Sequence, residues 1–260
     1  MTEATSRPRA LVTGASGGIG EAFARQLAKR GHDVVLVARR RERLEKLAAE
    51  LSQACGIGAE VMEADLADDG AVAAVEERLR RGDIDVLVNN AGFGTRGEFA
   101  ALPLGRELEE LDVNVRALMR LTHAALGPMV ERGRGAIVNV ASTGAFQPVP
   151  YMSTYAATKA FVLHFSEGLH EEVKSKGVTV TCLCPGATRT EFQKVAGVDE
   201  GSLRAWKTPD DVVRSALKGM TSRRAITVPG ALNVSLMAAV KLMPRFAARR
   251  IAGSMFKRGE

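Results

Sequence analysis

Tyr155, Lys159 and Ser142 have the types and spacing of a proton-transfer group. Tyr155 and Lys159 lie four residues apart in STYAATKAF, and Ser142 lies thirteen residues before Tyr155. Residues four apart share one helix face, so the phenol and the ammonium would point into the same space. A nearby cation favours phenolate, which predicts that Lys159 lowers the pKa of Tyr155 from its ordinary value of about 10. Such a tyrosine can protonate a carbonyl oxygen or deprotonate an alcohol. An isolated pair of this spacing is usually a surface contact, so the interpretation depends on the rest of the chain.

The elements that must position these side chains follow from alternating apolar runs and helical patterns. Apolar or β-branched runs recur in RALVTG, DVVLVA, GAEVMEADL, IDVLVNNAG, GAIVNVAS, VTVTCLCPG and AITVPG. Helical periodicity predicts helices over residues 21–30, 41–52, 71–81, 106–132 and 155–176, and a capped helix start at Thr208. This alternation predicts an α/β fold with a doubly wound, mostly parallel seven-stranded sheet and helices on both faces. Because no linker divides the 260 residues, we expect one domain over 1–230 and an extension over 231–260.

A glycine-rich turn joins the first predicted strand to the first helix. In TGASGGIG, the glycines Gly14, Gly18 and Gly20 would let the backbone approach a pyrophosphate. The helix amino terminus that follows offers free N–H groups and a favourable dipole. A purely structural turn is the alternative, but the strand–turn–helix context favours a dinucleotide site.

The end of the second predicted strand indicates which dinucleotide. An NAD site would place an acid there for the ribose 2′-hydroxyl, whereas this chain has Ala38 followed by Arg39, Arg40 and Arg41. A guanidinium can bind a 2′-phosphate through paired hydrogen bonds. We therefore predict NADP(H), with Arg39 as the main ligand and Arg40 as its assistant. The alternative is a solvated helix start, since the arginine run continues to Arg43.

Together these motifs resemble the short-chain dehydrogenase/reductase family from about Arg9 to Gly230. The resemblance implies a Rossmann-like fold and a catalytic set of Asn114, Ser142, Tyr155 and Lys159. It further implies a cofactor site made by Thr13, Gly14, Ser16, Gly18, Ile19, Gly20, Arg39, Arg40, Asp65, Leu66, Asn90, Ala91, Gly92, Tyr155, Lys159, Pro185, Gly186, Thr188 and Thr190. In NNAG, Asn89 begins the segment that steadies the central strands in this family.

The chemistry implied by the resemblance is hydride transfer between NADP(H) and a carbonyl or secondary alcohol. Tyr155 would handle the proton, and Lys159 would lower its pKa and hold the nicotinamide ribose. Ser142 would bind the substrate oxygen, and Asn114 would anchor a water that connects Lys159 to solvent. The rival hypothesis is a catalytically redundant protein of the same fold that senses the cofactor or binds a membrane surface.

The substrate is expected to be a lipophilic ketone, such as a 3-oxoacyl or steroid-like compound. In this family three segments line the pocket, and here they carry Phe93, Phe99, Phe146, Val149, Tyr151, Phe192 and Trp206. These side chains indicate an apolar or aromatic ketone more than a sugar. Several of them could simply be core residues. Arg96 and Arg189 could meet an acidic group, although exposed loop arginines are common.

The net charge of +6 is concentrated at the end of the chain. Residues 218–260 carry nine Lys/Arg against one acid, which is +8 and leaves −2 on the other 217 residues. This distribution argues against a nucleic-acid partner. Within 231–260 the pattern indicates an amphipathic basic segment broken at Pro244, with the apolar residues Leu236, Val240, Met243 and Phe246 and the basic residues Lys241, Arg245, Arg249 and Arg250. We expect it to pack on its own or a partner subunit, or to lie peripherally on an anionic membrane.

The remaining features predict an ordinary cytoplasmic protein. The first residues, MTEATSRPR, have no apolar segment, so no secretory signal is evident. Three cysteines make neither a disulfide framework nor a metal site, and Cys182 and Cys184 are best explained as buried thiols. By analogy with the family, we expect a homodimer or homotetramer, with the apolar stripe of Phe161, Val162, Phe165 and Leu169 serving either the interface or the core.

Overall fold

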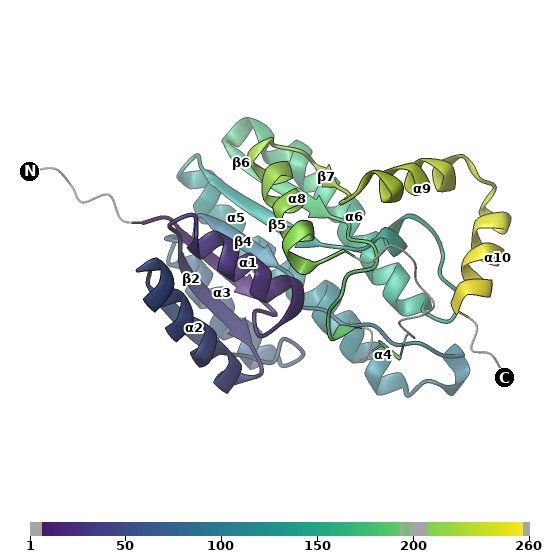
Figure 1. Ribbon diagram of the computed structural model, residues 1–260, viewed down its shortest axis with the longest axis horizontal. Coiled ribbons are helices and arrows are strands. Elements are labelled where there is room, and N and C mark those ends of the chain that lie inside the picture. The colour runs from purple at the N-terminus through teal and green to yellow at the C-terminus, as the bar shows by residue number, and fades with distance from the viewer. Residues whose placement is uncertain (1–6, 193–195, 198–206, 257–260) are drawn as a thin grey trace, which may run out of the picture.

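A seven-stranded, entirely parallel sheet forms the centre of the computed structural model (Figure 1), which describes residues 7–192, 196–197 and 207–256. Its strands are β1 (Arg9–Thr13), β2 (Asp33–Ala38), β3 (Ala59–Glu63), β4 (Val86–Asn89), β5 (Gly135–Val140), β6 (Val178–Leu183) and β7 (Ile226–Thr227). The order across the sheet is β3-β2-β1-β4-β5-β6-β7, so the chain changes direction between β1 and β4. The predicted doubly wound fold is confirmed, and this reversal is where such sheets bind their ligands.

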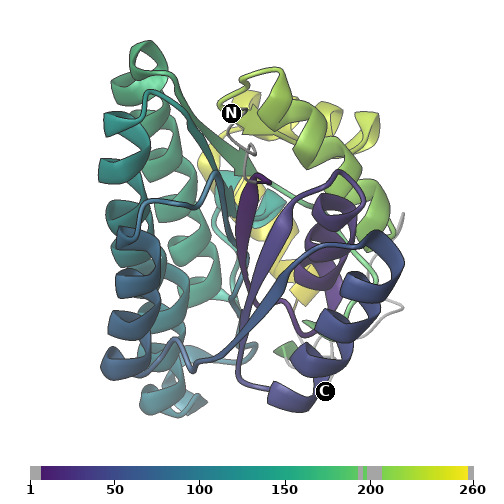
Figure 2. The ribbon, with the colours of Figure 1, turned by 90° about the vertical axis from the view of Figure 1, so that its left-hand side faces the viewer.

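Helices cover both faces of the sheet (Figure 2). One face carries α1 (Gly18–Ala28), α2 (Arg41–Cys55) and α8 (Pro209–Thr221), and the other carries α3 (Asp69–Arg80), α5 (Leu118–Glu131) and α6 (Ser153–Val173). The alternation of side chains along β1 explains both cores: Ala10 and Val12 pack under the first group, while Leu11 packs under the second. The remaining helical segments are α4 (Leu104–Leu111), η1 (Phe99–Ala101), η2 (Asp112–Ala117), η3 (Thr143–Phe146), η4 (Lys174–Lys176), α9 (Ala231–Leu242) and α10 (Arg245–Phe256).

The helix predicted over residues 106–132 is continuous but not regular. It runs through α4, the π-helical turn η2 and α5, so that one turn holds an extra residue. Asn114 lies in this π-helical turn, a distortion that is common at functional sites. The predicted start at Thr208 is confirmed, since its hydroxyl accepts a hydrogen bond from the Asp211 N–H at 3.2 Å.

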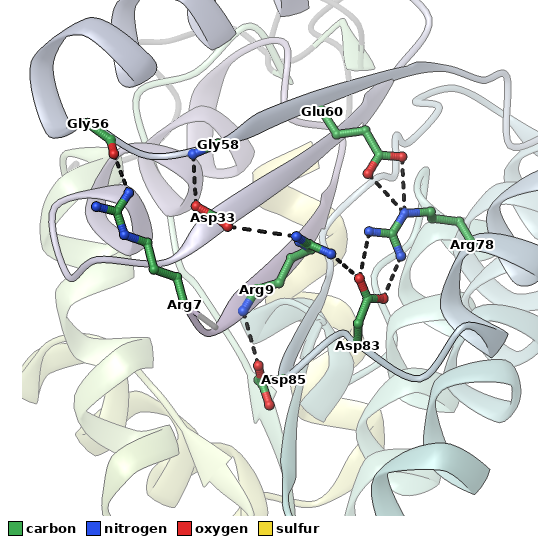
Figure 3. Close-up of polar contacts among 9 residues, drawn as sticks. All are labelled: Arg7, Arg9, Asp33, Gly56, Gly58, Glu60, Arg78, Asp83 and Asp85. Carbon is green, nitrogen blue, oxygen red and sulfur yellow. Dashed lines mark hydrogen bonds and ion pairs between the residues drawn. The ribbon is translucent and has the colours of Figure 1, made fainter. Parts of the chain in front are cut away.

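A network of ion pairs ties together the amino-terminal ends of the strands (Figure 3). The buried Arg78 guanidinium bonds both oxygens of Glu60 at 3.0 Å and Asp83 Oδ1 at 2.7 Å. Arg9 at the start of β1 pairs with Asp83 and with Asp33, whose carboxylate accepts the Gly58 N–H at 2.8 Å. This network fixes the end of the sheet that lies opposite the glycine turn.

The carboxyl-terminal extension forms two helices, α9 and α10, separated at Pro244 as the sequence predicts. Small residues of α10, Ala248 and Ala252, are buried, and Gly253 lies close to Pro150 of the main domain. The other side of the extension exposes large apolar residues, namely Leu232, Val234, Leu236, Leu242, Phe246 and Ile251. Within the described ranges, no helix combines the length and apolar character needed to cross a membrane.

Candidate active site

The glycine turn at the carboxyl end of β1 is shaped by close backbone contacts. Gly14 has a φ of +66°, and a Cβ on Gly20 would lie 2.2 Å from the Gly14 carbonyl oxygen. Only glycine fits such positions without a shift of backbone. Gly17, at the N-cap of α1, provides no side-chain cap, so the N–H groups of the first turn remain available. The turn and helix therefore form a cradle that fits the pyrophosphate of a dinucleotide.

The cradle is locked to β4 by Thr13 and Asn90. The Thr13 hydroxyl accepts the N–H groups of Asn90 at 2.9 Å and Ala91 at 3.0 Å. In return, Asn90 Nδ2 donates to the Thr13 carbonyl at 2.9 Å. These bonds hold the ends of β1 and β4 at a fixed separation, which places the segment from Asn90 to Gly92 directly beside the turn.

Two guanidinium groups follow β2, and they lie differently from the sequence prediction. Arg40, not Arg39, reaches the cradle: its Nε donates to Ser16 Oγ at 3.1 Å. Arg39 is 64% exposed and lies 3.7 Å from Asp65 and 3.9 Å from Glu109. Arg40 is in addition paired at 2.6 Å with Glu191, a residue that follows the predicted cofactor segment.

Glu191 thus joins that segment to the arginines. Its second oxygen pairs with Arg43 at 2.9 Å, and the two guanidinium groups lower the pKa of Glu191 to about 2. Sequence reasoning missed this pair because Glu191 and Arg43 lie 148 residues apart.

The proposed proton-transfer residues meet at the carboxyl end of β5. Ser142 hydrogen-bonds the Tyr155 phenol, and its Oγ accepts the Gly144 N–H at 3.1 Å. Lys159 is 4% exposed, and its Nζ donates to the Val140 carbonyl at 2.9 Å. The spacing argument is therefore confirmed in its geometry, since one helix, α6, carries both the phenol and the ammonium.

The predicted lowering of the Tyr155 pKa is wrong for the protein chain alone. Burial raises the pKa of Tyr155 to about 12, opposed by the Ser142 hydrogen bond and reinforced by the Glu110 carboxylate. Lys159 Nζ lies 5.8 Å from the centre of the phenol ring and is turned to Val140. Burial also lowers the pKa of Lys159, to about 8. The phenol therefore keeps its proton at neutral pH, as a proton donor requires.

Asn114 lies against the same site and bonds the segment after β4 and helix α6. It is fully buried; its Nδ2 donates to the Phe93 carbonyl at 2.8 Å and to Thr158 Oγ1 at 3.1 Å, while its Oδ1 accepts the Phe93 N–H at 3.1 Å. A Cβ on Gly92 would lie 2.7 Å from Asn114 Oδ1 and 3.2 Å from Lys159 Nζ. Asn114 thus holds the segment after β4 tightly against Lys159.

The other predicted cofactor residues lie around this cradle. A Cβ on Gly18 would contact Thr190, and Ile19 packs on the core beneath. Pro185 accepts the Thr143 N–H at 2.9 Å, which holds the predicted cofactor segment to η3. The remaining predicted cofactor residues make local contacts. Asp65 accepts a hydrogen bond from the Ala67 N–H, and Leu66 is buried in the core. Gly186 lies against Asn233, and the Thr188 hydroxyl donates to the Gly186 carbonyl.

An apolar cluster surrounds the Tyr155 ring. Val149, Met152, Ala156 and Ala196 are buried there, and Phe192 packs on Tyr155 with ring centroids 5.3 Å apart. Other expected pocket residues lie elsewhere: Phe146 packs in a core cluster with β6, Phe99 is exposed, and Phe93 lies under the Arg106 guanidinium. Tyr151 has a φ of +66°, Arg189 is exposed, and Arg96 is buried and donates to the Gly197 carbonyl. Trp206 lies outside the described residues.

A polar ladder beneath the site confirms the expected role of Asn89. Its Nδ2 bonds Thr122 Oγ1 at 2.9 Å and Asn139 Oδ1 at 3.0 Å. Asn139 Nδ2 then reaches Ser166 of α6 at 3.0 Å. This ladder joins β4, β5, α5 and α6, so it fixes the helix that carries Tyr155.

Sequence reasoning missed two buried acids of α4, Glu107 and Glu110. Burial raises the pKa of Glu110 to about 7, and the negative charge of Glu107 adds to this effect. The spacing of three residues places both on one helix face, but nothing in the sequence shows that this face is the buried one.

The chain is similar in sequence and in structure to known proteins. The model of the short chain dehydrogenase family matches residues 8–201. The chain is 36% identical over 216 residues to a very-long-chain 3-oxoacyl-CoA reductase of Anas platyrhynchos, covering 80% of this chain and 67% of the relative. A short-chain dehydrogenase of Sphingobium yanoikuyae in complex with NADPH has a TM-score of 0.83 and 40% identity, covering 92% and 97% of the two chains. The bulky-bulky ketone specific alcohol dehydrogenase of Comamonas testosteroni has a TM-score of 0.79 and 35% identity, covering 90% and 92%. The chain therefore belongs to the short-chain dehydrogenase/reductase family of oxidoreductases.

Proposed function

We propose that this protein is an NADPH-dependent reductase of bulky, lipophilic ketones. The observation that carries the proposal is the Tyr155 phenol, hydrogen-bonded to Ser142 at the edge of an apolar cluster. A bound nicotinamide would supply the hydride. Ser142 would orient the carbonyl oxygen of the substrate, and Tyr155 would donate the proton that this oxygen takes up.

The residues that would hold the cofactor are those of the glycine cradle and its border. Gly14, Gly18 and Gly20 leave room for the pyrophosphate, and the α1 amino terminus would bind it. Arg40, with Arg39 beside it, would bind a 2′-phosphate, and the strand end at Ala38 offers no acid to repel one. The NADPH complex of the Sphingobium relative supports this choice.

The substrate class is supported by two observations. The cluster of Val149, Met152, Phe192 and Ala196 gives the Tyr155 hydroxyl an apolar surrounding, which favours an apolar ligand. The relatives named above are a 3-oxoacyl-CoA reductase and an enzyme specific for bulky ketones. A 3-oxoacyl or steroid-like ketone fits both observations.

The direct test is NADPH oxidation, followed by absorbance, with a panel of carbonyl compounds. We expect bulky aryl and long-chain 3-oxo compounds to react and small polar ketoses to fail. Tyr155→Phe keeps the ring but removes the proton, so turnover should fall roughly 10²- to 10⁴-fold, the usual contribution of general acid catalysis. NADPH binding, measured by fluorescence, should persist in this variant. Reaction of ketoses alone, or full turnover by Tyr155→Phe, would overturn the proposal.

The helix α4 supports a homo-oligomer. It buries its acids Glu107 and Glu110 but exposes Leu104, Leu108 and Leu111, which is the reverse of the pattern for a helix that faces solvent. Exposed apolar side chains in a row favour a protein partner, and a second copy of the chain is the partner we propose. Sedimentation analysis should show a dimer or tetramer, which Leu108→Glu should weaken.

The extension over residues 231–260 supports a secondary proposal, peripheral contact with an anionic membrane. Exposed Leu232, Leu236 and Phe246 adjoin the exposed arginines Arg249 and Arg250, a combination typical of helices that lie on membrane surfaces. Co-sedimentation with anionic vesicles should require residues 231–260. Equal binding with and without them would remove this proposal.

A further inference from the structure

An acid lies against the arginines that a cofactor phosphate would need. Glu191 Oε2 lies 2.6 Å from Arg40 Nη1, and Glu191 Oε1 lies 2.9 Å from Arg43 Nη1. A Cβ on Gly17, the N-cap of α1, would lie 3.3 Å from Arg40 Nη2 and 3.8 Å from Glu191 Oε2. The carboxylate is therefore held at the rim of the glycine turn, where the proposed cofactor site would receive an anion.

All three nitrogens of the Arg40 guanidinium are in use. Its Nε and Nη2 donate to Ser16, to the hydroxyl at 3.1 Å and to the carbonyl at 3.2 Å, while its Nη1 donates to Glu191. A phosphate binds a guanidinium most strongly through two parallel hydrogen bonds. To form them, it has to replace one of these partners. Ser16 belongs to the turn, and Glu191 carries a negative charge that repels a phosphate, so Glu191 is the partner to be replaced.

The neighbouring pair of Arg41 with Glu45 shows how unusual the placement of Glu191 is. Arg41 and Glu45 lie 2.7 Å apart and four residues apart on α2, a common arrangement on a solvated helix face. Glu191 instead comes from a segment 151 residues after Arg40, and it contacts two guanidinium groups at once. Its placement is therefore a property of the fold and not of the arginine run.

Contacts on both sides of Glu191 direct its side chain to the turn. A Cβ on Gly18 would lie 3.1 Å from Thr190 Cγ2, so Thr190 lies against the start of α1. Phe192 packs on the Tyr155 ring, and its N–H donates to Thr190 Oγ1 at 3.2 Å. A carboxylate tethered in this way meets the guanidinium groups as an intramolecular ligand, at a high effective concentration. A phosphate from solution must compete with it.

We propose that Glu191 is a built-in competitor of the cofactor's 2′-phosphate: its carboxylate occupies Arg40 and Arg43 in the protein without cofactor and leaves them when NADPH binds. The inference rests on the proposed function for the identity of the cofactor. NADH has no 2′-phosphate and does not need these arginines, so the competition lowers the affinity for NADPH more than that for NADH. Specificity is a difference of affinities, and Glu191 therefore limits how strongly the protein prefers NADPH.

The test is the binding of two adenosine fragments, 2′,5′-ADP and 5′-AMP, measured by titration calorimetry. Neither fragment carries a nicotinamide, so turnover does not enter. Glu191→Gln keeps the size of the side chain and removes its charge. We expect it to bind 2′,5′-ADP about 3- to 10-fold more tightly, as for the loss of two half-exposed ion pairs, and to raise the affinity ratio of 2′,5′-ADP to 5′-AMP. A merely structural tie predicts the opposite sign, because a loosened segment would weaken the site.

Glu45→Gln is the matched control. It removes the same charge from a partner of the same arginine run, but it releases Arg41, which lies away from the turn. We expect its affinity ratio to equal that of the wild type. A second comparison separates competition from general charge repulsion: in an Arg40→Ala background, Glu191→Gln should lose most of its effect on the ratio, whereas general repulsion would leave that effect intact.

The outcomes distinguish this inference from the proposed function. Equal or weaker binding of 2′,5′-ADP by Glu191→Gln, or an equal gain in Glu45→Gln, would refute the role of Glu191. If wild type and Glu191→Gln both bind 2′,5′-ADP no better than 5′-AMP, the NADP(H) assignment fails and this inference fails with it. A protein that shows the expected binding but reduces no ketone would overturn the proposed reduction alone.

Discussion

Arg40→Ala is the sharpest test of how this protein selects its cofactor. The Arg40 guanidinium bonds Ser16 Oγ at 3.1 Å and the Ser16 carbonyl at 3.2 Å, so it lies against the turn that would hold the pyrophosphate. Arg39 instead lies near Asp65 and Glu109, and is mostly exposed. If the 2′-phosphate is bound beside the turn, Arg40 is the arginine already in place. The loss should therefore be larger for Arg40→Ala than for Arg39→Ala.

The magnitude follows from the kind of bond and its exposure. A hydrogen bond to a charged group contributes about 1.5–3 kcal/mol, and the lower half of that range applies because the Arg40 side chain is 44% exposed. A loss of about 1.5–2 kcal/mol corresponds to roughly a 10- to 30-fold fall in kcat/KM for NADPH. NADH has no 2′-phosphate, so its kcat/KM should change little. The ratio of the two efficiencies thus cancels any general damage to the turn.

The control for this experiment is the neighbouring Arg41. It belongs to the same arginine run, but it pairs with Glu45 at 2.7 Å and lies away from the turn. Arg41→Ala makes the same change in net charge and should leave the NADPH-to-NADH ratio unchanged. An unchanged ratio in Arg40→Ala, or an equal fall in Arg41→Ala, would refute the assignment of the 2′-phosphate site.

Three further predictions concern the glycine turn, an open position of α6 and the ion-pair network at the opposite end of the sheet. Gly20→Ala places a methyl group 2.2 Å from the Gly14 carbonyl oxygen, so NADPH binding, measured by titration calorimetry, should be lost. The same overpacking should destabilise the folded protein by about 1–3 kcal/mol. Gly168→Ala, at an open position inside α6, should instead stabilise the folded protein by about 0.5–1 kcal/mol. Arg78→Met breaks the pairing of the buried Arg78 guanidinium with Asp83 and should cost about 1–2 kcal/mol in urea unfolding at pH 7, because the carboxylates left behind are partly solvated. Because Arg78 helps to hold the pKa of Asp83 below its ordinary value, this contribution is complete above the unfolded pKa of about 4 and is lost as pH falls through the folded pKa. The difference between wild type and Arg78→Met should therefore shrink in acid, and a constant difference would contradict the ion-pair explanation.

The fold was predictable because its signals are local. Apolar runs mark the strands, and the cap at Thr208 lies within four residues of its partner Asp211. The glycine turn was predictable for the same reason, since the close approach of Gly20 to Gly14 follows from a short loop between a strand and a helix. The pairing of Tyr155 with Lys159 on one helix face needed only the helical period.

What sequence could not predict depends on contacts between distant segments. Adjacent residues after β2 point to different sides, so that Arg40 contacts the turn and Arg39 does not. Arg40 also pairs with Glu191, which lies 151 residues later in the chain. Glu110 is charged, and helix periodicity alone would place it toward solvent. The structure buries it because the exposed side of α4 carries Leu104 and Leu108 instead. A reversal of this kind becomes visible only when the neighbours of the helix are known.

The raised pKa of Tyr155 determines which form of the phenol is present at neutral pH. Because burial raises the pKa of Tyr155 to about 12, the phenol keeps its proton at pH 7 in the protein without a cofactor. Alcohol oxidation needs the phenolate as a base, which is the minor form of Tyr155 at neutral pH in the protein without a cofactor. Carbonyl reduction needs the neutral phenol, which is already the dominant form. The negative charge of Glu110 adds to this rise of the Tyr155 pKa. We therefore expect the proposed ketone reduction to use the neutral phenol, the form of Tyr155 that dominates at neutral pH.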